Sequence, residues 1–404
     1  MSTSLLYHGF GIRGYQYVHT QYKAGNIVFK IRQDPKKLRC SQCGSKQIIR
    51  RGKVNRLFRS RPIGNKPVWI ALAIQRILCL SCGVLRQVKV DFADRRRSYT
   101  KSFERYALDL SRHMTILDVA HHLNVSWDVI KNIQKQNLVR RYRRPKLKKL
   151  RQIAIDEIAI RKGHHYLTIV LDIKSGAVVF VGEGKGAEAL DPFWKRLKCA
   201  KAKVEAIAMD MSPAYMSAVV ENMKGVTIVF DHFHIIKLFN DKLSDFRRKL
   251  YHEVTTVMEK AVLKGTRWLL LKNPENLNED RNEHQRLQDA LKLNEPLATA
   301  YYMKEDLRQL WTQADKASAK AFLHAWIRRA QASRISMLMK FAKTLAAHRT
   351  GILAYYDYPI STGPLEGINN KIKTMKRQAY GFRDIEFFKL KIMAIHETKY
   401  ALVG

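Results

Sequence analysis

Hydrophobic and polar residues follow different periods in successive parts of the chain. Residues 25–32 alternate with a period of two, and residues 68–78 form a nearly continuous apolar run, so both favour strands. Residues 115–133 repeat their apolar positions with the helical period, with one interruption at Asn124 and Val125. The pattern therefore predicts a strand-rich segment followed by two helices joined by a short turn.

Between residues 150 and 235 the pattern changes to alternating strands and helices. We expect strands over 152–160, 165–172, 176–182, 204–210 and 225–231, with helices over 187–198, from 212 and from about 233. Three strands, helix, strand, helix, strand is the order of the ribonuclease-H-like nucleases. Residues 236–350 then read as almost continuous helix, which predicts an all-α insertion.

The last strongly periodic stretch begins at Pro364, which suits the first position of a helix. Its apolar positions are Ile368, Ile372, Met375 and Ala379, and the polar positions Glu366, Asn370, Lys373 and Arg377 fall on the opposite side. One carboxylate at a helix start above an amide and basic stripe suits a metal ion next to a phosphate backbone. Alternatively, the glutamate only interacts favourably with the positive end of the helix dipole.

These changes of pattern indicate a multidomain α/β protein. The expected segments are an N-terminal segment 1–35, a zinc ribbon 36–92, a helix-turn-helix 95–142, a basic linker 143–150, a ribonuclease-H-like core 151–235, an α-helical insertion 236–350 and the last part of the core 351–404.

The charge of the chain points to a polyanion partner. In 404 residues, 74 Lys and Arg stand against 35 Asp and Glu, a formal net charge of +39. No apolar run is long enough for a membrane span, and the N-terminus has no signal-peptide core, so we expect no membrane partner and a cytoplasmic, nucleoid-associated protein. Charge alone leaves RNA binding open.

Two Cys-x-x-Cys pairs carry the clearest metal signal. Cys40 with Cys43, and Cys79 with Cys82, each form a tight pair that can direct two thiolates at one structural Zn²⁺ ion. The text between the pairs is strand-like, which predicts a ribbon with a hairpin between its knuckles. Unrelated cysteines or a redox pair are the alternatives, and Cys199 is expected to be an inert thiol.

The helix–turn–helix pattern predicts DNA binding. Thr115 with Asp118 resembles a capping box, and Ser126 is expected to cap the second helix. The outward positions that best suit a DNA groove are Lys131, Asn132 and Lys135. An ordinary helical hairpin fits the same spacing.

Two aspartates stand at chemically unusual places. Asp156 lies inside an apolar strand, where a lone charge is costly unless it is paired or bound to a metal. Asp210 ends a strand, where open α/β sheets place their sites, although helix capping is an alternative. Adjacent Glu157 points to the other face of the strand and is not expected to share the role.

Asp156, Asp210 and Glu366, in this order, make the chain resemble the Asp-Asp-Glu transposases and retroviral integrases, and more closely the insertion-sequence transposases of the ISL-three type. The family's motifs are similar to Met209–Tyr215, Asp231-His-Phe-His234, Leu365–Lys373 and Tyr380-Gly-Phe-Arg383, and the ribbon followed by a helix-turn-helix fits as well. The likeness covers roughly residues 36 to 400. Ser361-Thr-Gly departs from the family's more usual Ser-Asn-Ala.

The resemblance implies a catalytic site and its partners. Asp156, Asp210 and Glu366 would hold two Mg²⁺ or Mn²⁺ ions, with Asp231 and His234 near the site. Water would cut at the element's end, and the freed 3′-OH would attack target DNA. The partners would be double-stranded DNA, namely terminal inverted repeats and target, and a second copy in a homodimer or larger assembly. The expected backbone contacts are Asn370, Lys373, Lys376 and Arg377.

Two other functions remain open at this point. A non-catalytic zinc and helix-turn-helix regulator explains the charge and residues 36–144 but not Asp156 or Glu366. A nuclease of the same fold that only hydrolyses DNA would use the same metals, but it would not need the N-terminal modules.

Overall fold

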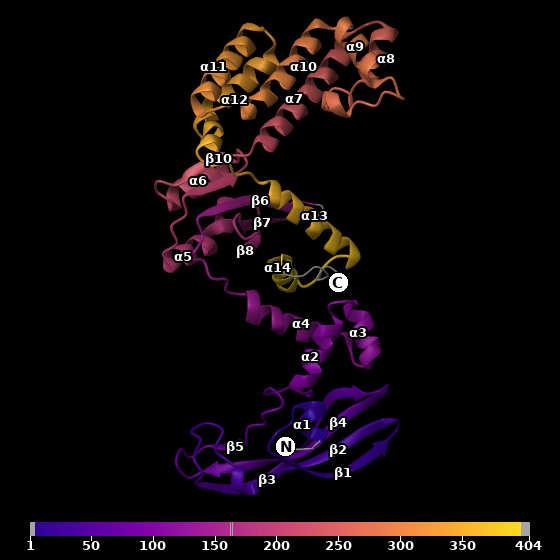
Figure 1. Cartoon of the computed structure of the whole chain (residues 1–404), viewed down its shortest axis with the longest axis vertical. Helices are drawn as coiled ribbons and strands as arrows, with labels where there is room; N and C mark the ends of the chain where they lie inside the picture. Colours follow the sequence, from indigo (N-terminus) through magenta and orange to yellow (C-terminus); the bar gives the residue numbers. More distant parts are fainter. Residues whose placement is uncertain (1–4, 162, 164, 397–404) are drawn as a thin grey trace. The chain divides into compact units, whose positions relative to one another are not determined.

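The computed structural model describes residues 5–161, 163 and 165–396, and these form two compact units (Figure 1). The first unit holds the described residues up to 143 together with 374–394. The second holds the described residues of 144–373 with 395–396. Each unit is described by itself.

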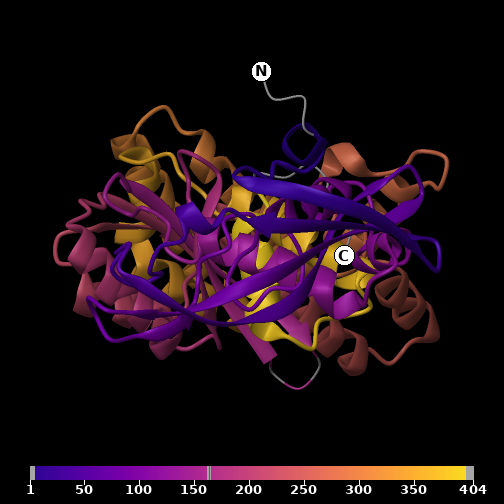
Figure 2. The same cartoon turned by 90° about the horizontal axis from the view of Figure 1, so that it is seen from below.

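The N-terminal part of the first unit is a five-stranded sheet, whose long strands are drawn in indigo in Figure 2. Its path is β1-β2-β4-β3, and β5 pairs with β4. The expected strands at 25–32 and 68–78 correspond to β2 and β4, and β3 and β4 form the hairpin predicted between the two cysteine pairs. The elements are α1 (Leu5–Phe10), β1 (Tyr15–Lys23), β2 (Asn26–Gln33), η1 (Pro35–Lys37), β3 (Ile48–Ile63), β4 (Lys66–Cys79) and β5 (Leu85–Gln87).

Four helices complete the first unit: α2 (Lys101–Leu110), α3 (Ile116–Leu123), α4 (Trp127–Tyr142) and α14 (Ile385–Ala394). The predicted turn lies between α3 and α4, where Asn124 takes a left-handed conformation with φ 48°. Thr115 caps α3 by accepting a hydrogen bond from the N–H of Asp118 at 3.1 Å. The expected side-chain cap by Ser126 is wrong: its own carbonyl, rather than its hydroxyl, accepts the N–H of Val129 at 3.0 Å.

Helix α14 belongs to the same core as the helix-turn-helix. Phe387 of α14 packs in one buried cluster with Ile130 and Ile133 of α4. Residues 374–394 therefore group with the helix-turn-helix, although 351–404 was expected to form one segment with the α/β core. The periodic pattern predicted the two helices at 115–133 but no separate helix over 385–394, and it could not say which core the C-terminal apolar residues enter.

The second unit contains a mixed five-stranded sheet of order β10-β9-β6-β7-β8. Strands β6, β9 and β10 run parallel, while β6, β7 and β8 are antiparallel neighbours. The order of elements is the one that the sequence predicted. They are β6 (Gln152–Arg161), β7 (His165–Asp172), β8 (Ala177–Glu183), η2 (Ala187–Leu190), α5 (Asp191–Ala200), β9 (Ala206–Met209), α6 (Pro213–Asn222) and β10 (Thr227–Phe230).

The segment expected to be helical, 236–350, consists of helices and their connections. Its core is built on Phe239, Trp326 and Phe341, whose ring centroids lie 4.8–6.2 Å apart. The chain then returns to the sheet, where Gly351 lies so close to the ring of Phe230 that a Cβ there would come within 2.5 Å of it. The elements are α7 (His232–Glu253), α8 (Val257–Gly265), η3 (Pro274–Asn276), α9 (Glu283–Leu293), α10 (Glu295–Arg308), η4 (Gln309–Thr312), α11 (Lys316–Ala332), α12 (Ser336–Leu353), η5 (Ala354–Tyr356) and α13 (Gly363–Gln378).

Helix α13 buries the apolar stripe that the sequence predicted. Ile368, Ile372 and Met375 are 7%, 1% and 0% exposed. Across the part of the chain that the structure describes, no helix is both long and apolar enough to cross a bilayer.

Candidate metal centres and DNA-binding surface

The four cysteines of the two predicted pairs converge at one end of the β3–β4 hairpin. The Sγ atoms of Cys40 and Cys82 are 3.7 Å apart, and those of Cys43 and Cys79 are 3.5 Å apart. A tetrahedral zinc ion with Zn–S bonds of about 2.3 Å requires sulfur–sulfur distances of about 3.8 Å. Among the described residues, this is the only group of three or more Cys, His, Asp or Glu side chains whose ligand atoms all lie within 4.8 Å of one another.

Each cysteine pair is shaped by a glycine that follows it. Gly44 and Gly83 have φ values of 74° and 67°, and their N–H groups donate to the carbonyls of Cys40 and Cys79 at 3.0 and 2.9 Å. Only glycine adopts this backbone readily, so each turn folds back on its first cysteine. The N–H groups of Cys43 and Gln42 lower the pKa of Cys40 to about 6, which favours the thiolate that zinc binds. The geometry and the donors therefore fit a structural Zn²⁺.

In the second unit, the register of the sheet places two of the predicted acids side by side. Strands β6 and β9 are parallel, with Ala154 opposite Ala208. Two residues further along each strand, Asp156 and Asp210 therefore reach the same level on neighbouring strands, which are about 4.8 Å apart. Asp231 follows β10 at the same edge, where its N–H donates to the carbonyl of Met209 at 3.1 Å.

The acids at this edge repel one another. Burial raises the pKa of Asp156, and the nearby charge of Asp210 raises it further. The Asp156 carboxylate accepts hydrogen bonds from Asn369 Nδ2 at 2.8 Å and from the N–H of Glu157 at 2.9 Å. These two bonds do not cancel the cost of burial, so the site favours an additional positive charge.

Glu157 belongs to this charged group, although strand alternation predicted no role for it. Burial raises the pKa of Glu157, and the charges of Asp210 and Asp156 raise it as well, while a hydrogen bond from Tyr215 opposes them. The Tyr215 hydroxyl is also 3.0 Å from the hydroxyl of Thr168, the residue paired with Glu157 across β6 and β7. Strand alternation predicts opposite faces for neighbouring residues, but the electrostatic interaction between two carboxylates extends over a longer distance than the one that separates the two faces.

Helix α13 is held against the acids by two residues that sequence reasoning missed. The Thr362 hydroxyl donates to the Asp231 carboxylate, and Asn369 donates to Asp156. Residues 362, 366 and 369 are spaced four and three apart, so Glu366 lies between the two anchors on the same side of the helix. The Asn369 Oδ1 atom is buried and accepts no hydrogen bond within the described residues, which leaves an oxygen donor beside Asp156.

Glu366 itself is exposed. The three predicted carboxylates do not meet within 4.8 Å in the described residues, since only the cysteines do so. The structure therefore brings Asp156 and Asp210 together and holds the helix of Glu366 next to them, but it does not close the triad.

Asp231 and His234 lie at the start of α7, beside the acids. Asp231 is 2% exposed and accepts the N–H of Phe233 at 3.4 Å, so it caps the helix. The His234 Nε2 atom is 4.0 Å from the Asp231 carboxylate, and a positive charge on His234 would lower the pKa of Asp156. Asp231 thus joins α7 to the start of α13, and His234 faces the charged group.

In the first unit, two of the predicted groove residues are paired with acids of the C-terminal region. Lys131 and Lys135 place their Nζ atoms 3.2 and 3.0 Å from the Asp384 carboxylate, and Lys135 also lies 2.8 Å from Glu386. Burial opposes ionisation of Asp384, but the N–H of Phe387 and the two lysines lower its pKa to about 2. The lysine side chains are 21% and 22% exposed.

Asn132 lies on the exposed part of α4, away from these pairs. Asn370, Lys373 and Arg377 are exposed on α13, and Lys376 is half-buried. The DNA contacts assigned to these residues, and to Lys131 and Lys135, stay predictions.

Comparison with known proteins identifies all three parts of the chain. The family model DDE_Tnp_ISL3, described as a transposase, matches residues 153–392. The model of the helix-turn-helix domain of transposase family ISL3 matches residues 88–136, and that of the zinc-finger of transposase IS204/IS1001/IS1096/IS1165 matches residues 36–82.

Two relatives match over most of their length. The chain is 31% identical to the transposase for insertion sequence element IS1001 of Bordetella parapertussis over 393 residues, which cover 96% of this chain and 95% of the relative. It is 28% identical over 370 residues to the transposase for insertion sequence element IS1557 of Mycobacterium tuberculosis, with 85% and 82% covered. The Drosophila P element transposase strand transfer complex matches with a TM-score of 0.39 at 11% identity, over 76% of this chain and 94% of that chain, which is too low to establish a shared fold.

Proposed function

The chain belongs to transposase family ISL3 and is an insertion-sequence transposase of the DDE type, and we propose that Asp156, Asp210 and Glu366 form its catalytic site. The observation that carries this proposal is the parallel register of β6 and β9, which aligns the two aspartates. We propose that residues 151–235 form a ribonuclease-H-like core, that 236–350 is an insertion in it, and that α13 supplies its third acid.

The donors at this site fit divalent cations that prefer oxygen. Carboxylate and amide oxygens are hard ligands suited to Mg²⁺ or Mn²⁺, and two buried like charges favour a cation between them. When bound, two such ions would activate an attacking oxygen and neutralise charge on a phosphate. Asp156, Asp210 and Glu366 would hold them, and the buried Asn369 Oδ1 atom, which has no hydrogen-bond partner within the described residues, is a further oxygen donor on a side chain bonded to Asp156.

The remaining residues of the site would position these ligands and the DNA. Asn369 fixes the orientation of the Asp156 carboxylate, and Thr362 ties the start of α13 to Asp231. We propose that His234 contacts the scissile strand, because it faces the acids and is held near Asp231. Asn370, Lys373, Lys376 and Arg377 would then follow the DNA backbone along α13.

The proposed reaction has two phosphoryl transfers. Water attacks the phosphorus at the element's end and breaks its bond to the 3′ oxygen, which leaves a 3′-OH on the element and a 5′ phosphate on the flanking DNA. The freed 3′-OH then attacks a phosphodiester of target DNA, and the bond from this phosphorus to the target's 3′ oxygen breaks, so that the element is joined and a target 3′-OH is released. The zinc ribbon and the helix-turn-helix would bind the terminal inverted repeats, where Asn132 is exposed for base contact. Two ends must be brought together, so we propose a homodimer or a larger assembly on DNA.

The test is an assay of the full chain on duplexes that carry the element's ends, with Mg²⁺ or Mn²⁺. We expect end cleavage followed by joining of the 3′ strand to a second duplex. Glu366→Gln is expected to abolish both reactions while leaving end binding intact, and Glu221→Gln, an exposed helical glutamate of the same unit, is the matched control.

Other outcomes assign the alternative functions. Cleavage without joining would indicate a hydrolytic nuclease, and binding without either reaction would indicate a regulator. Normal cleavage by Glu366→Gln would remove Glu366 from the site.

A further inference from the structure

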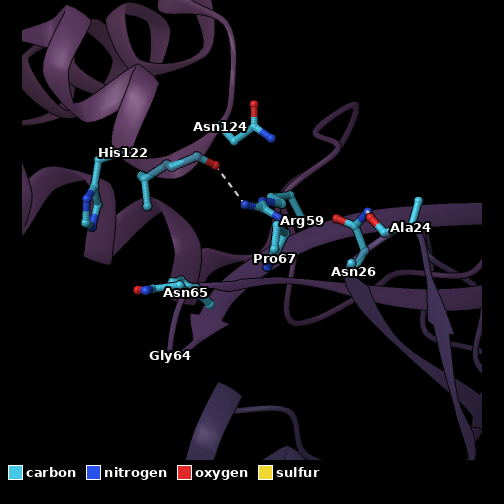
Figure 3. Close-up of a pocket in the computed structure, with 11 residues that line it drawn as sticks. Ala24, Asn26, Arg59, Gly64, Asn65, Pro67, His122 and Asn124 are labelled. Atoms are coloured by element: carbon cyan, nitrogen blue, oxygen red, sulfur yellow. Dashed lines mark hydrogen bonds between the residues drawn. The ribbon is translucent and has the colours of Figure 1, made fainter.

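A pocket of about 480 Å³ lies where three turns of the first unit meet (Figure 3). The β1–β2 turn contributes Ala24 and Gly25, the β3–β4 turn contributes Gly64 and Asn65, and the turn between α3 and α4 contributes Asn124. The sheet and the helix-turn-helix therefore share one concave surface, which none of the roles described above uses.

Arg59 forms part of the wall of this pocket and is a buried cation. It is 5% exposed, and its Nη2 atom donates to the carbonyl of Leu123 at 2.7 Å, the dashed line in Figure 3. The rings of Trp69 and Phe103 lie 5.4 and 5.9 Å from the guanidinium carbon.

The Arg59 guanidinium has no anionic partner in the described residues. Its buried Nε atom makes no hydrogen bond there, and burial alone lowers its pKa. A buried charge without a counter-charge is costly, so an anion that enters the pocket would gain from this cation.

The other polar side chains that line the pocket are three asparagine amides and the imidazole of His122. The amides of Asn65 and Asn124 make no side-chain hydrogen bond within the described residues, whereas Asn26 is already bonded to Trp69 Nε1 at 3.3 Å. Asn124 also stands two residues before Ser126, whose hydroxyl does not cap α4. The first N–H groups of α4 and the positive end of its dipole therefore lie close to the pocket along the chain.

We propose that this pocket binds one backbone phosphate of the terminal-repeat DNA. In helix-turn-helix proteins the N-terminal part of the second helix enters the major groove, so a phosphate beside this groove falls next to the α3–α4 turn. A phosphodiester supplies the negative charge that Arg59 lacks and acceptors for the two asparagines. The zinc ribbon and the helix-turn-helix would then bind the same DNA phosphate together. This inference rests on the proposed end-binding function.

The experiment replaces each phosphate of a terminal-repeat duplex in turn by an uncharged methylphosphonate, and it measures the affinity of the full chain by fluorescence anisotropy. Loss of one charge-assisted contact is expected to weaken binding about tenfold at one position near the α4 contact. Asn124→Asp is expected to weaken binding of the unmodified duplex to a similar degree and to have little effect on the duplex that is neutral at that position.

The matched variants separate a local contact from general charge and from misfolding. Asn124→Gly accepts the same left-handed backbone, φ 48°, without adding charge, and is expected to have a smaller effect. Asn282→Asp adds the same charge at another left-handed asparagine, φ 50°, in the second unit and is expected to leave the affinity unchanged. An Asn124→Asp variant that weakens binding equally at every methylphosphonate position, or not at all, would overturn the proposal.

Two further outcomes are distinguishable from these. Failure of the unaltered chain to bind end DNA would overturn the proposed function itself. Titration with inorganic phosphate in the absence of DNA tests the other source of the same chemistry: saturable binding that Asn124→Asp removes would assign the pocket to free phosphate, whereas no saturable binding supports the DNA backbone.

Discussion

The two candidate metal centres of this chain are built in opposite ways. The four sulfurs of the first unit come from one hairpin and already stand at tetrahedral distances, 3.5 and 3.7 Å for two of the pairs. The carboxylates of the second unit come from two strands and a helix, and they do not converge to 4.8 Å in the described residues. The geometry of the first centre is set by the fold itself, whereas the carboxylates of the proposed second centre do not converge without a compensating charge.

The two units also differ in how their charged side chains are compensated, here at helix α4 of the first unit and at the acids of the second. In the first unit Lys131 and Lys135 are neutralised by Asp384, whose pKa falls to about 2. In the second unit Asp156 and Asp210 have like charges, and the pKa of Asp156 rises because of burial and this repulsion. The lysines of the first unit are thus compensated within the fold, whereas the second unit keeps carboxylates of like charge whose repulsion a cation would relieve.

The largest expected effect concerns the cysteine site. Cys40→Ser removes one of four thiolates, and we expect loss of one bound zinc per chain together with several kcal/mol of folding free energy in the first unit. Elemental analysis and thermal melting measure both, and end binding should be lost with them. Cys199→Ser, an exposed thiol outside the cluster, is the control and should keep its zinc and its stability. Full zinc occupancy in Cys40→Ser would contradict this account.

Asp156→Asn breaks the second site without the same structural cost. It should lower the rate of end cleavage by at least about 10²-fold, because a ligand of the reacting centre is lost. The amide is not charged, so the melting temperature should stay equal or rise without added metal. Glu205→Gln changes a carboxylate just before β9, at the other end of that strand, and should alter neither property. Cleavage near the normal rate in Asp156→Asn would exclude this aspartate from catalysis.

Melting temperatures measured over a range of pH in the presence of a metal chelator test the difference between the two centres further. The folded state raises the pKa of Asp156 above its ordinary 3.8, so the folded chain binds more protons than the unfolded one. The favourable contribution of the protonated form is therefore present at low pH and is lost as the pH rises from 3.8 through the folded pKa. Melting temperatures should fall over that window less steeply in Asp156→Asn, and Mg²⁺ should restore stability at neutral pH only in the unaltered chain. Equal slopes of melting temperature against pH for both proteins would show that ionisation of Asp156 does not destabilise the folded chain.

The same contrast explains what the sequence could predict. The cysteine pairs are local signals, since each turn folds on itself at Gly44 or Gly83, and their spacing is enough to propose zinc. Asp156 was recognisable as a charge inside an apolar strand and Asp210 as a charge at a strand end, and only the family resemblance implied that the two share a site. Asn369 and Thr362 were missed because nothing in their own neighbourhood reveals a partner more than 130 positions away.

The assignment of α14 failed for a related reason. No helix was predicted over 385–394, and these residues were expected to join the α/β core, but Phe387 packs with Ile130 and Ile133, which lie in another part of the chain. Lys131 and Lys135 were predicted to face outward on α4, and the sequence could not show that Asp384 would lie against them and leave them only 21% and 22% exposed. Both misses concern long-range pairing, which periodicity does not encode.

Asp384→Asn should have the smallest effect, because it only loosens a neutralised pair. Asparagine also caps helices well, so α14 should keep its start while Lys131 and Lys135 lose their counter-charge. Partly exposed ion pairs contribute about 0.2–1 kcal/mol, so if these lysines reach DNA phosphate, end affinity at low salt should rise by up to about fivefold. The dependence of affinity on salt should become steeper at the same time.

Asp245→Asn, which breaks an exposed pair with Arg248 in the second unit, controls for the change in net charge. A lower melting temperature of Asp384→Asn with unchanged affinity would mean that the two lysines serve to dock α14 and do not contact DNA. Because Asn132 is exposed on the neighbouring position of α4, DNA recognition by this helix would then depend on the row of residues that includes it. The affinity of Asn132→Ala for end DNA, measured in the same assay, decides whether DNA contacts the face of α4 that carries Asn132 or the face that carries Lys131 and Lys135.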